Sequence, residues 1–221
     1  RLRSMPGNVA AKAMAAALRG RPTGELATGE VDRLAVVIQP LAKARVDGRV
    51  RTLSEYGNLY VLPPMLQAGK KLNEPRYIAA AKRGMEYFRK KPDLVEFKPE
   101  LAMLSHYFGY MMEALVDLGE VELAKKGLKQ ALAVQAKDGS IPAFPGSRWV
   151  CSTGLAQLAI AWYKLGQREP ADKAMDYMMR LQNPSGGFYG GYGKGAKYFP
   201  DAEIPWAVKF FLDAVLLRNR K

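Results

Sequence analysis

Hydrophobic positions along the chain predict a protein made almost entirely of helices. Residues 155–163 are apolar on nearly every side, which is typical of a helix buried on both faces. Residues 170–181 instead carry one apolar stripe opposite charged residues, the pattern of a helix with one face in water. No segment shows the alternation of a β-strand. Further helices are predicted at residues 8–18, 30–46, 60–72, 74–89, 105–118, 121–135 and 203–217, for a total of about nine.

One order of elements recurs along the chain at a spacing of 47 residues. Each unit consists of an apolar helix, a glycine turn, an amphipathic helix and a glycine-rich loop. Buried helices that alternate with half-exposed ones predict two concentric layers, with the apolar helices inside. An open solenoid of the tetratricopeptide type is the alternative, but its usual period is about 34 residues. The markers of the repeat are the pairs Ser105 and Ser152, Gly119 and Gly166, and Gln135 and Gln182.

Two loops of the repeat carry a related motif, Q-A-K-D-G-S at residues 135–140 and Q-N-P-S-G-G-F at residues 182–188. Both resemble the Q-x-x-x-G-x-W repeats of terpenoid-cyclase and prenyltransferase α/α toroids. Similar loops occur in α/α-barrel carbohydrate epimerases, uronyl epimerases and polysaccharide lyases. The resemblance covers residues 54–217, with Ile141 and Phe188 in place of the usual tryptophan. It implies an all-α fold, an incomplete α/α toroid in which the Gln side chain caps helix ends and the aromatic residue packs between helices.

Length and charge refine this picture. The 221 residues suit one domain, which we divide into basic N-terminal helices (1–53), repeat units (54–217) and a basic tail (218–221). The net charge is +13, and residues 1–51 carry ten Lys or Arg against four acidic residues. Such basic ends suit an acidic protein partner or another anionic ligand. Aromatic residues do not interleave with the basic clusters, so we expect no specific nucleic-acid binding.

The sequence lacks the residues that several classes of chemistry require. The chain has one His and one Cys, which excludes a cysteine-rich zinc site and H-E-x-x-H, and we expect no metal and no cofactor. The D-x-D-D and D-D-x-x-D motifs of isoprenoid ionisation are also missing. No apolar run reaches the roughly 18 residues of a membrane span, so no transmembrane segment is expected. The chain begins with Arg1 and shows no targeting segment; the compartment stays open, with the cytoplasm favoured.

Two long loops precede inner helices and are the candidates for ligand binding. In residues 138–153, an arginine could hold a carboxylate and a tryptophan could stack on a sugar ring. The alternatives are an arginine paired with a neighbouring acid and a tryptophan in the core. Residues 188–206 combine glycines with three tyrosines, as in loops that close over ligands. The predicted substrate-binding residues are Arg148, Trp149, Tyr189, Tyr192, Tyr198, Asp201 and Trp206.

A general base is the second requirement for chemistry on sugars. His106 follows Ser105 at the start of an inner helix, where it could act as a base or remain a satisfied core residue. Asp201 and Glu203 precede the last helix, either as a carboxylate pair or as its N-terminal caps. Tyrosines opposite a base suit epimerase or lyase chemistry, which abstracts a proton beside a carboxylate. The candidate catalytic residues are His106, Tyr107, Tyr56 and Glu203.

Three functions remain open at this point. The first is a carbohydrate-related role, in which the protein binds or modifies an acidic sugar or glycan conjugate. The second is a non-catalytic helical scaffold for an acidic protein partner, since no complete catalytic motif is present. The third is isoprenoid or lipid binding, which a cavity lined by Phe, Leu and Met would favour. Whether the protein is an enzyme is not decided by the sequence.

Overall fold

The computed structural model describes residues 56–99 and 103–220, and the helices predicted at 8–18 and 30–46 lie outside this part of the chain. Within it, every other predicted helix is present. No helix of the described residues is long and apolar enough to cross a bilayer. The helices are η2 (Asn58–Val61), α4 (Leu62–Lys71), α5 (Pro75–Arg89), α6 (Ser105–Asp117), α7 (Val121–Ala133), α8 (Ser152–Lys164), α9 (Arg168–Arg180) and α10 (Pro205–Arg218).

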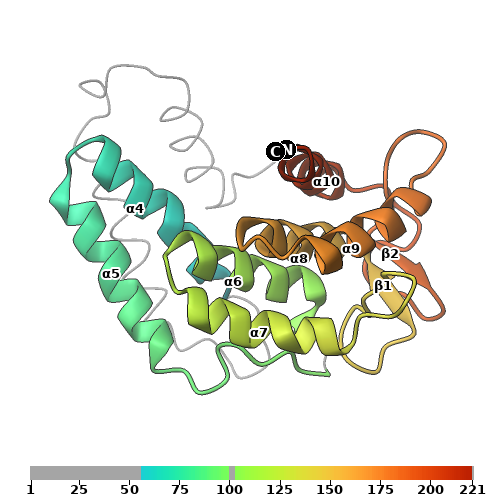
Figure 1. Ribbon diagram of the computed structural model, residues 1–221, viewed down its shortest axis with the longest axis horizontal. Coiled ribbons are helices and arrows are strands. Elements are labelled where there is room, and N and C mark those ends of the chain that lie inside the picture. The colour runs from blue at the N-terminus through green and yellow to red at the C-terminus, as the bar shows by residue number, and fades with distance from the viewer. Residues whose placement is uncertain (1–55, 100–102, 221) are drawn as a thin grey trace, which may run out of the picture.

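The helices form an arc of two layers, an incomplete α/α toroid (Figure 1). In the inner layer α6 packs against α8 and α8 against α10, while α5 and α9 pack outside α4 and α8. Every residue of α8 from Ser152 to Tyr163 is buried, which confirms the predicted two-sided burial. The outer helix α9 buries one face only, through Ala171, Ala174, Met175 and Met178. These four residues belong to the apolar stripe that the sequence predicts.

The 47-residue repeat is confirmed at the level of individual hydrogen bonds. In the first loop, Gln135 Nε2 donates to the carbonyl oxygen of Gly139 at 3.4 Å; in the second, Gln182 Nε2 donates to that of Gly186 at 2.9 Å. The two glycines have φ angles of +91° and +88°, which disfavour other residues. At Gly139 a Cβ would also lie 1.9 Å from the carbonyl oxygen of Lys173. The motif therefore shapes the loop between an outer helix and the next unit.

The residues that stand where the similar repeats have tryptophan, Ile141 and Phe188, lie in the core. Ile141 and Phe188 are 1% and 0% exposed. The ring of Phe188 lies 5.0 Å from that of Phe211 on α10, so it packs between helices as the resemblance implies. These residues contribute to the architecture.

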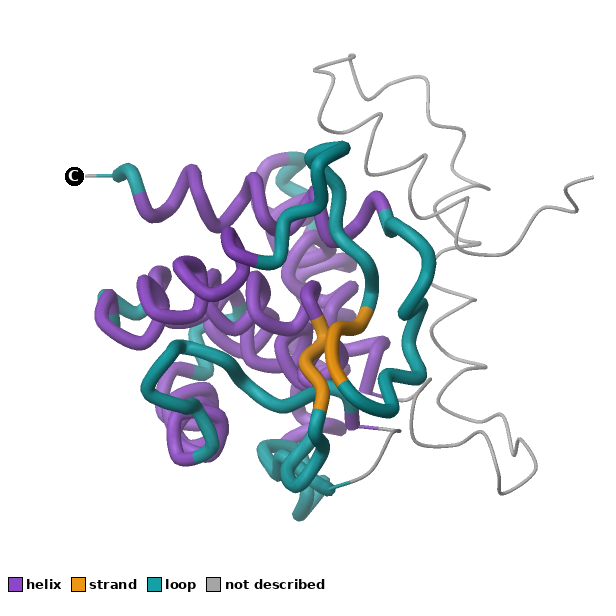
Figure 2. The backbone as a smooth tube through the Cα atoms, turned by 90° about the vertical axis from the view of Figure 1, so that its right-hand side faces the viewer, coloured by secondary structure: helices purple, strands orange, loops and turns teal. Residues whose placement is uncertain are grey.

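Two short strands, which the sequence analysis did not predict, join the long loops. β1 (Trp149–Cys151) and β2 (Gly191–Gly193) pair antiparallel, with Trp149 opposite Gly193 (Figure 2). All three residues of β1 are buried, so no alternation of polar and apolar positions marks it. The pairing holds the loops 138–153 and 188–206 side by side ahead of α8 and α10.

Candidate functional site

Both long loops are bonded to the starts of inner helices. The backbone N–H of Ser105, the first residue of α6, donates to the carbonyl oxygen of Ala143 at 2.6 Å. The hydroxyl of Ser152, the first residue of α8, donates to the carbonyl oxygen of Tyr189 at 2.6 Å. These bonds place residues of both loops at one end of the inner layer. We call this region the inner-helix end and define it by the starts of α6, α8 and α10 with the two loops.

His106 is a buried titratable group of the inner-helix end. Its side chain is 4% exposed, and its Nδ1 lies 2.6 Å from Oε1 of Gln157 on α8. Since an amide oxygen only accepts, Nδ1 donates in this bond and Nε2 is the nitrogen without a proton. Burial lowers the pKa of His106 to about 4, although the bond to Gln157 acts in the opposite direction. The imidazole is therefore neutral near pH 7.

Aromatic side chains surround this imidazole. Tyr198 comes from the glycine-rich loop, and its hydroxyl accepts a hydrogen bond from Nε1 of Trp206 at 3.1 Å. Both of these side chains are partly exposed. The structure thus brings together four of the predicted site residues: His106, Tyr107, Tyr198 and Trp206. The rings near His106 are those of Tyr110 at 4.6 Å, Tyr107 at 5.1 Å, Tyr198 at 5.7 Å and Phe210 at 6.5 Å between centroids.

Trp149 and Arg148 are neighbours in the chain but differ in environment. Trp149 is 5% exposed and packs with Cys151 and Phe144, so its indole lies in the core rather than in a free stacking position. Arg148 is exposed and makes no ion pair within the described residues. The strand pairing places Arg148 next to the end of β2, where Lys194 follows Gly193.

Glu203 has a structural partner that the sequence analysis did not foresee. Its carboxylate accepts hydrogen bonds from Ser185 Oγ and from Asn183 Nδ2, the latter at 2.8 Å. These bonds lower its pKa, so the group is ionised. The residue that precedes α10 is Ile204, and no side chain caps that helix. Of the two alternatives for Asp201 and Glu203, capping of α10 is therefore wrong, and a role as a carboxylate pair stays a prediction.

Tyr189 and Tyr192 form one hydrogen-bonded unit on the glycine-rich loop. The hydroxyl of Tyr192 accepts from the backbone N–H of Tyr189 at 2.8 Å and lies 3.3 Å from Oδ1 of Asn183. Their rings lie 5.6 Å apart. Asp201 is exposed beyond this unit.

Two tyrosines, Tyr56 and Tyr60, precede α4, and Tyr60 contacts the inner helix α6. The hydroxyl of Tyr56, the predicted catalytic residue, bonds to Asp93. The ring of Tyr60 instead lies 4.3 Å from that of Tyr110, and its hydroxyl lies 3.4 Å from Oε2 of Glu113. A catalytic role for Tyr56 stays a prediction. Tyr60 is better placed for such a role, because it packs on Tyr110, whose ring lies next to His106.

An ion pair between the buried Glu113 of α6 and Lys164, the last residue of α8, was missed by the sequence analysis. Glu113 is 7% exposed, and Nζ of Lys164 lies 3.1 Å from its Oε1 and 2.8 Å from Asp117. Burial raises the pKa of Glu113, and Lys164 only partly opposes this effect. Burial alone would lower the pKa of Lys164, but Glu113 and Asp117 raise it. The spacing of His106, Tyr110 and Glu113 places them on one face of a helix, and this spacing is the sequence signal that could have predicted where Glu113 lies.

Cys151 is not a nucleophile in this environment. It is fully buried, and burial raises the pKa of its thiol to about 12, so the thiolate is not formed near pH 7. Within residues 56–99 and 103–220 there is no group of three His, Cys, Asp or Glu side chains that could hold a metal ion.

Comparisons with known proteins identify the fold. No family model and no curated protein matches the sequence. Among solved structures, a glycosyl hydrolase family 88 protein from Bacteroides vulgatus matches with a TM-score of 0.60 and 13% identity over 88% of this chain and 69% of its own. A polysaccharide lyase matches with a TM-score of 0.56 and 14% identity over 88% and 67%. A UGL variant described with dGlcA-Glc-Rha-Glc matches at 0.55 and 19% identity over 75% and 58%.

These likenesses confirm that the chain has an α/α-toroid fold. This chain spans 58% to 69% of the length of the three structures. At such identities the likeness is one of fold, and the function has to be argued from the side chains at the inner-helix end.

Proposed function

We propose that the inner-helix end binds an acidic carbohydrate. The observation that carries this proposal is the set of partly exposed rings of Tyr107, Tyr110 and Tyr198 around His106, together with Trp206, which is hydrogen-bonded to Tyr198. Aromatic faces cover the apolar faces of sugar rings, and tyrosine and indole groups supply hydrogen bonds at the edges. The similar structures are named as a glycosyl hydrolase, a polysaccharide lyase and a protein with a dGlcA-containing saccharide, which supports this class of ligand.

The charges on the two loops favour an acidic sugar over a neutral one. Arg148 and Lys194 flank the same end of the β1–β2 pair, and Lys197 follows on the same loop. All three are exposed and make no ion pair within the described part of the chain. Like charges on paired strands are unfavourable to each other, and a bound carboxylate would relieve this repulsion. The loops therefore suit a uronate group.

The other two candidate functions have less support. An isoprenoid site needs an apolar lining, whereas the inner helix α6 carries the buried polar side chains of His106 and Glu113 and two tyrosines, Tyr107 and Tyr110. The acidic protein partner was expected at the basic ends of the chain, and residues 1–51 lie outside the described residues. At the other end, Arg218 is already paired with Asp176 at 2.7 Å.

Proton abstraction is a second activity that one observation favours. A neutral His106 with an unprotonated Nε2 has the form of a general base near pH 7. Its proton would come from the carbon beside a uronate carboxylate, as in lyase or epimerase chemistry. Such chemistry requires access to the imidazole, so Tyr198 on its glycine-rich loop would have to move aside.

Calorimetric titration tests the binding proposal. Oligogalacturonate should bind the full chain, and a neutral oligosaccharide of equal length should bind at least about tenfold more weakly. Tyr198→Ala and the pair Arg148→Gln with Lys194→Gln should each weaken binding of the acidic oligosaccharide about tenfold. The matched control, Lys126→Gln with Lys129→Gln on α7, should bind as the natural chain does. Equal affinity for both sugars, or no binding, would contradict the proposal.

A separate assay tests catalysis. Incubation with oligogalacturonate should yield an unsaturated uronate, seen as new ultraviolet absorbance, or an epimerised sugar, seen by NMR. His106→Gln should abolish either product while sugar binding persists. Binding without any product would assign the inner-helix end to recognition alone.

A further inference from the structure

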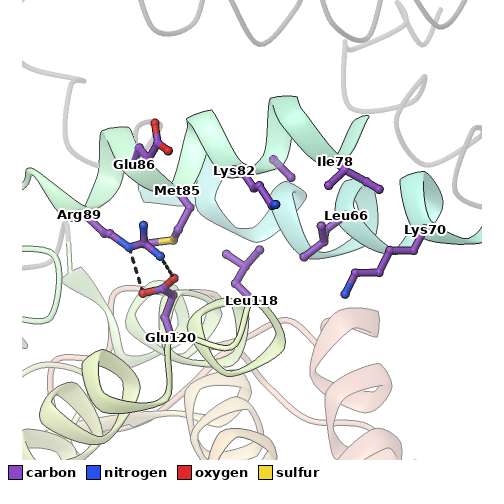
Figure 3. A pocket seen from close by; sticks show the side chains of 10 residues that line it. Leu66, Lys70, Ile78, Lys82, Met85, Glu86, Arg89, Leu118 and Glu120 are labelled. Atoms are coloured by element: carbon purple, nitrogen blue, oxygen red, sulfur yellow. Dashed lines mark hydrogen bonds and ion pairs between the residues drawn. The ribbon is translucent and has the colours of Figure 1, made fainter. Parts of the chain in front are cut away.

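A groove lies between the α4–α5 hairpin and the turn that joins α6 to α7 (Figure 3). Its volume is about 470 Å³, which is within the range of sites for small molecules. Leu118 of its lining directly follows α6, twelve residues after His106, or roughly 18 Å along the helix axis. The groove is therefore separate from the inner-helix end, and none of the described residues that line it is aromatic.

The floor of this groove is apolar. Its lining includes Leu66 of α4, Ile78 and Met85 of α5, and Leu118 after α6. Met85 is buried, while Leu66, Ile78 and Leu118 are partly exposed. A ligand with an apolar body would remove the exposed parts of these side chains from water, which is favourable.

Two lysines at the groove have no acidic partner among the described residues. Lys70 and Lys82 extend beside Leu66 (Figure 3), and neither makes an ion pair within residues 56–99 and 103–220. Glu86 also belongs to the lining, one helical turn after Lys82, where an ion pair is common, yet its carboxylate points away from Lys82 (Figure 3). The other acidic group of the lining, Glu120, is bound by Arg89.

We propose that this groove binds a small amphiphile with one anionic group, of the chemical class of a medium-chain carboxylate. The carboxylate lies between Lys70 and Lys82, and the apolar body covers Leu66, Ile78 and Leu118. Charge complementarity supports this orientation, because two unpaired cations adjoin the apolar floor and its acidic neighbour Glu120 is already neutralised. An uncharged chain of the same size lacks the ionic contact, and a free anion lacks the apolar one.

Displacement of a fluorescent probe from the full chain tests this proposal. Anilinonaphthalene sulfonate, itself an anionic amphiphile, is titrated into the protein until its fluorescence saturates. Decanoate should displace it at a concentration at least about tenfold lower than decanol, and inorganic phosphate should not displace it. Equal displacement by decanol, displacement by phosphate alone, or no displacement by decanoate would overturn the proposal.

Two matched pairs of substitutions locate the binding. Lys70→Glu with Lys82→Glu should weaken decanoate binding about tenfold or more. Lys126→Glu with Lys129→Glu makes the same change of charge on α7, outside the groove, and should leave binding unchanged. All four lysines are exposed, so the fold should persist, as circular dichroism can verify. Unchanged decanoate affinity in the groove variant, or an equal loss in the control, would overturn the assignment.

Discussion

The Nδ1 atom of His106 lies 2.6 Å from Oε1 of Gln157, and this bond joins the inner helices α6 and α8 where both side chains are buried. The bond fixes the imidazole with its Nε2 side free of a proton. Since Gln157 is uncharged, it cannot offset the burial of a protonated imidazole, which is why the pKa of His106 falls.

The low pKa of His106 makes stability depend on pH. In the unfolded chain a histidine has a pKa of about 6.5, so on acidification the unfolded state takes up its proton first. The unfolding free energy should therefore fall from pH 6.5 to pH 4, by about 3 kcal/mol from this residue. Chemical denaturation of the natural chain and His106→Asn at several pH values measures this. Parallel curves for the two proteins would contradict the assignment.

Changing Gln157 should shift the pKa of His106 in a direction set by the new side chain. Gln157→Leu removes the acceptor, so the pKa falls further and stability drops by about 1–3 kcal/mol. Gln157→Glu places a carboxylate beside the imidazole and should raise the pKa. NMR titration reads this directly, because the chain has one histidine. Gln167→Leu, at the start of α9, is the control and should leave the pKa unchanged.

The close approach of α6 and α8 depends on Gly154. A Cβ there would lie 2.0 Å from Ser105 Oγ and 2.8 Å from the backbone nitrogen of His106. Gly154→Ala should therefore destabilise the protein by about 1–3 kcal/mol in urea denaturation. At Gly57, which has a φ angle of −58°, no atom of the described residues lies within 4 Å of an added Cβ. Gly57→Ala should be neutral or slightly stabilising, and equal losses at both sites would exclude this account.

The ion pair between the buried Glu113 and the more exposed Lys164 should behave as a coupled unit. Lys164→Met leaves a 7% exposed carboxylate without its cation and should cost about 3 kcal/mol. Glu113→Gln combined with Lys164→Met should cost less than the sum of the two single changes. Denaturant titration of the four proteins gives the coupling energy. A value of zero would mean that the pair does not contribute as a unit.

The sequence predicted the architecture well because the repeat is local. The helices α6 and α8 begin at Ser105 and Ser152, and the loops that follow their outer helices turn at Gly139 and Gly186 with nearly the same φ angle. Helical periodicity and glycine at a positive φ angle are visible in any single sequence. Both signals depend only on residues that are close together in the sequence.

The candidate site was predicted only in part because it depends on contacts between distant segments. His106 and Tyr198 were correctly expected at one end of the inner layer, but the partner of His106, Gln157, is 51 residues away and carries no motif. Glu203 was interpreted from its position just before α10, whereas Asn183 and Ser185, 20 and 18 residues earlier in the same connection between α9 and α10, hold its carboxylate. The strand pairing that brings Arg148 near Lys194 is equally remote in the chain.

The most direct test of carbohydrate binding at the inner-helix end is the NMR signal of the single histidine during titration with oligogalacturonate. The rings that are proposed to contact the sugar lie around His106, so its ring resonances should shift and saturate together with the calorimetric binding curve. Tyr198→Ala should weaken that response in parallel with the affinity. Binding seen by calorimetry while the His106 signal stays unchanged would place the carbohydrate elsewhere and contradict the account.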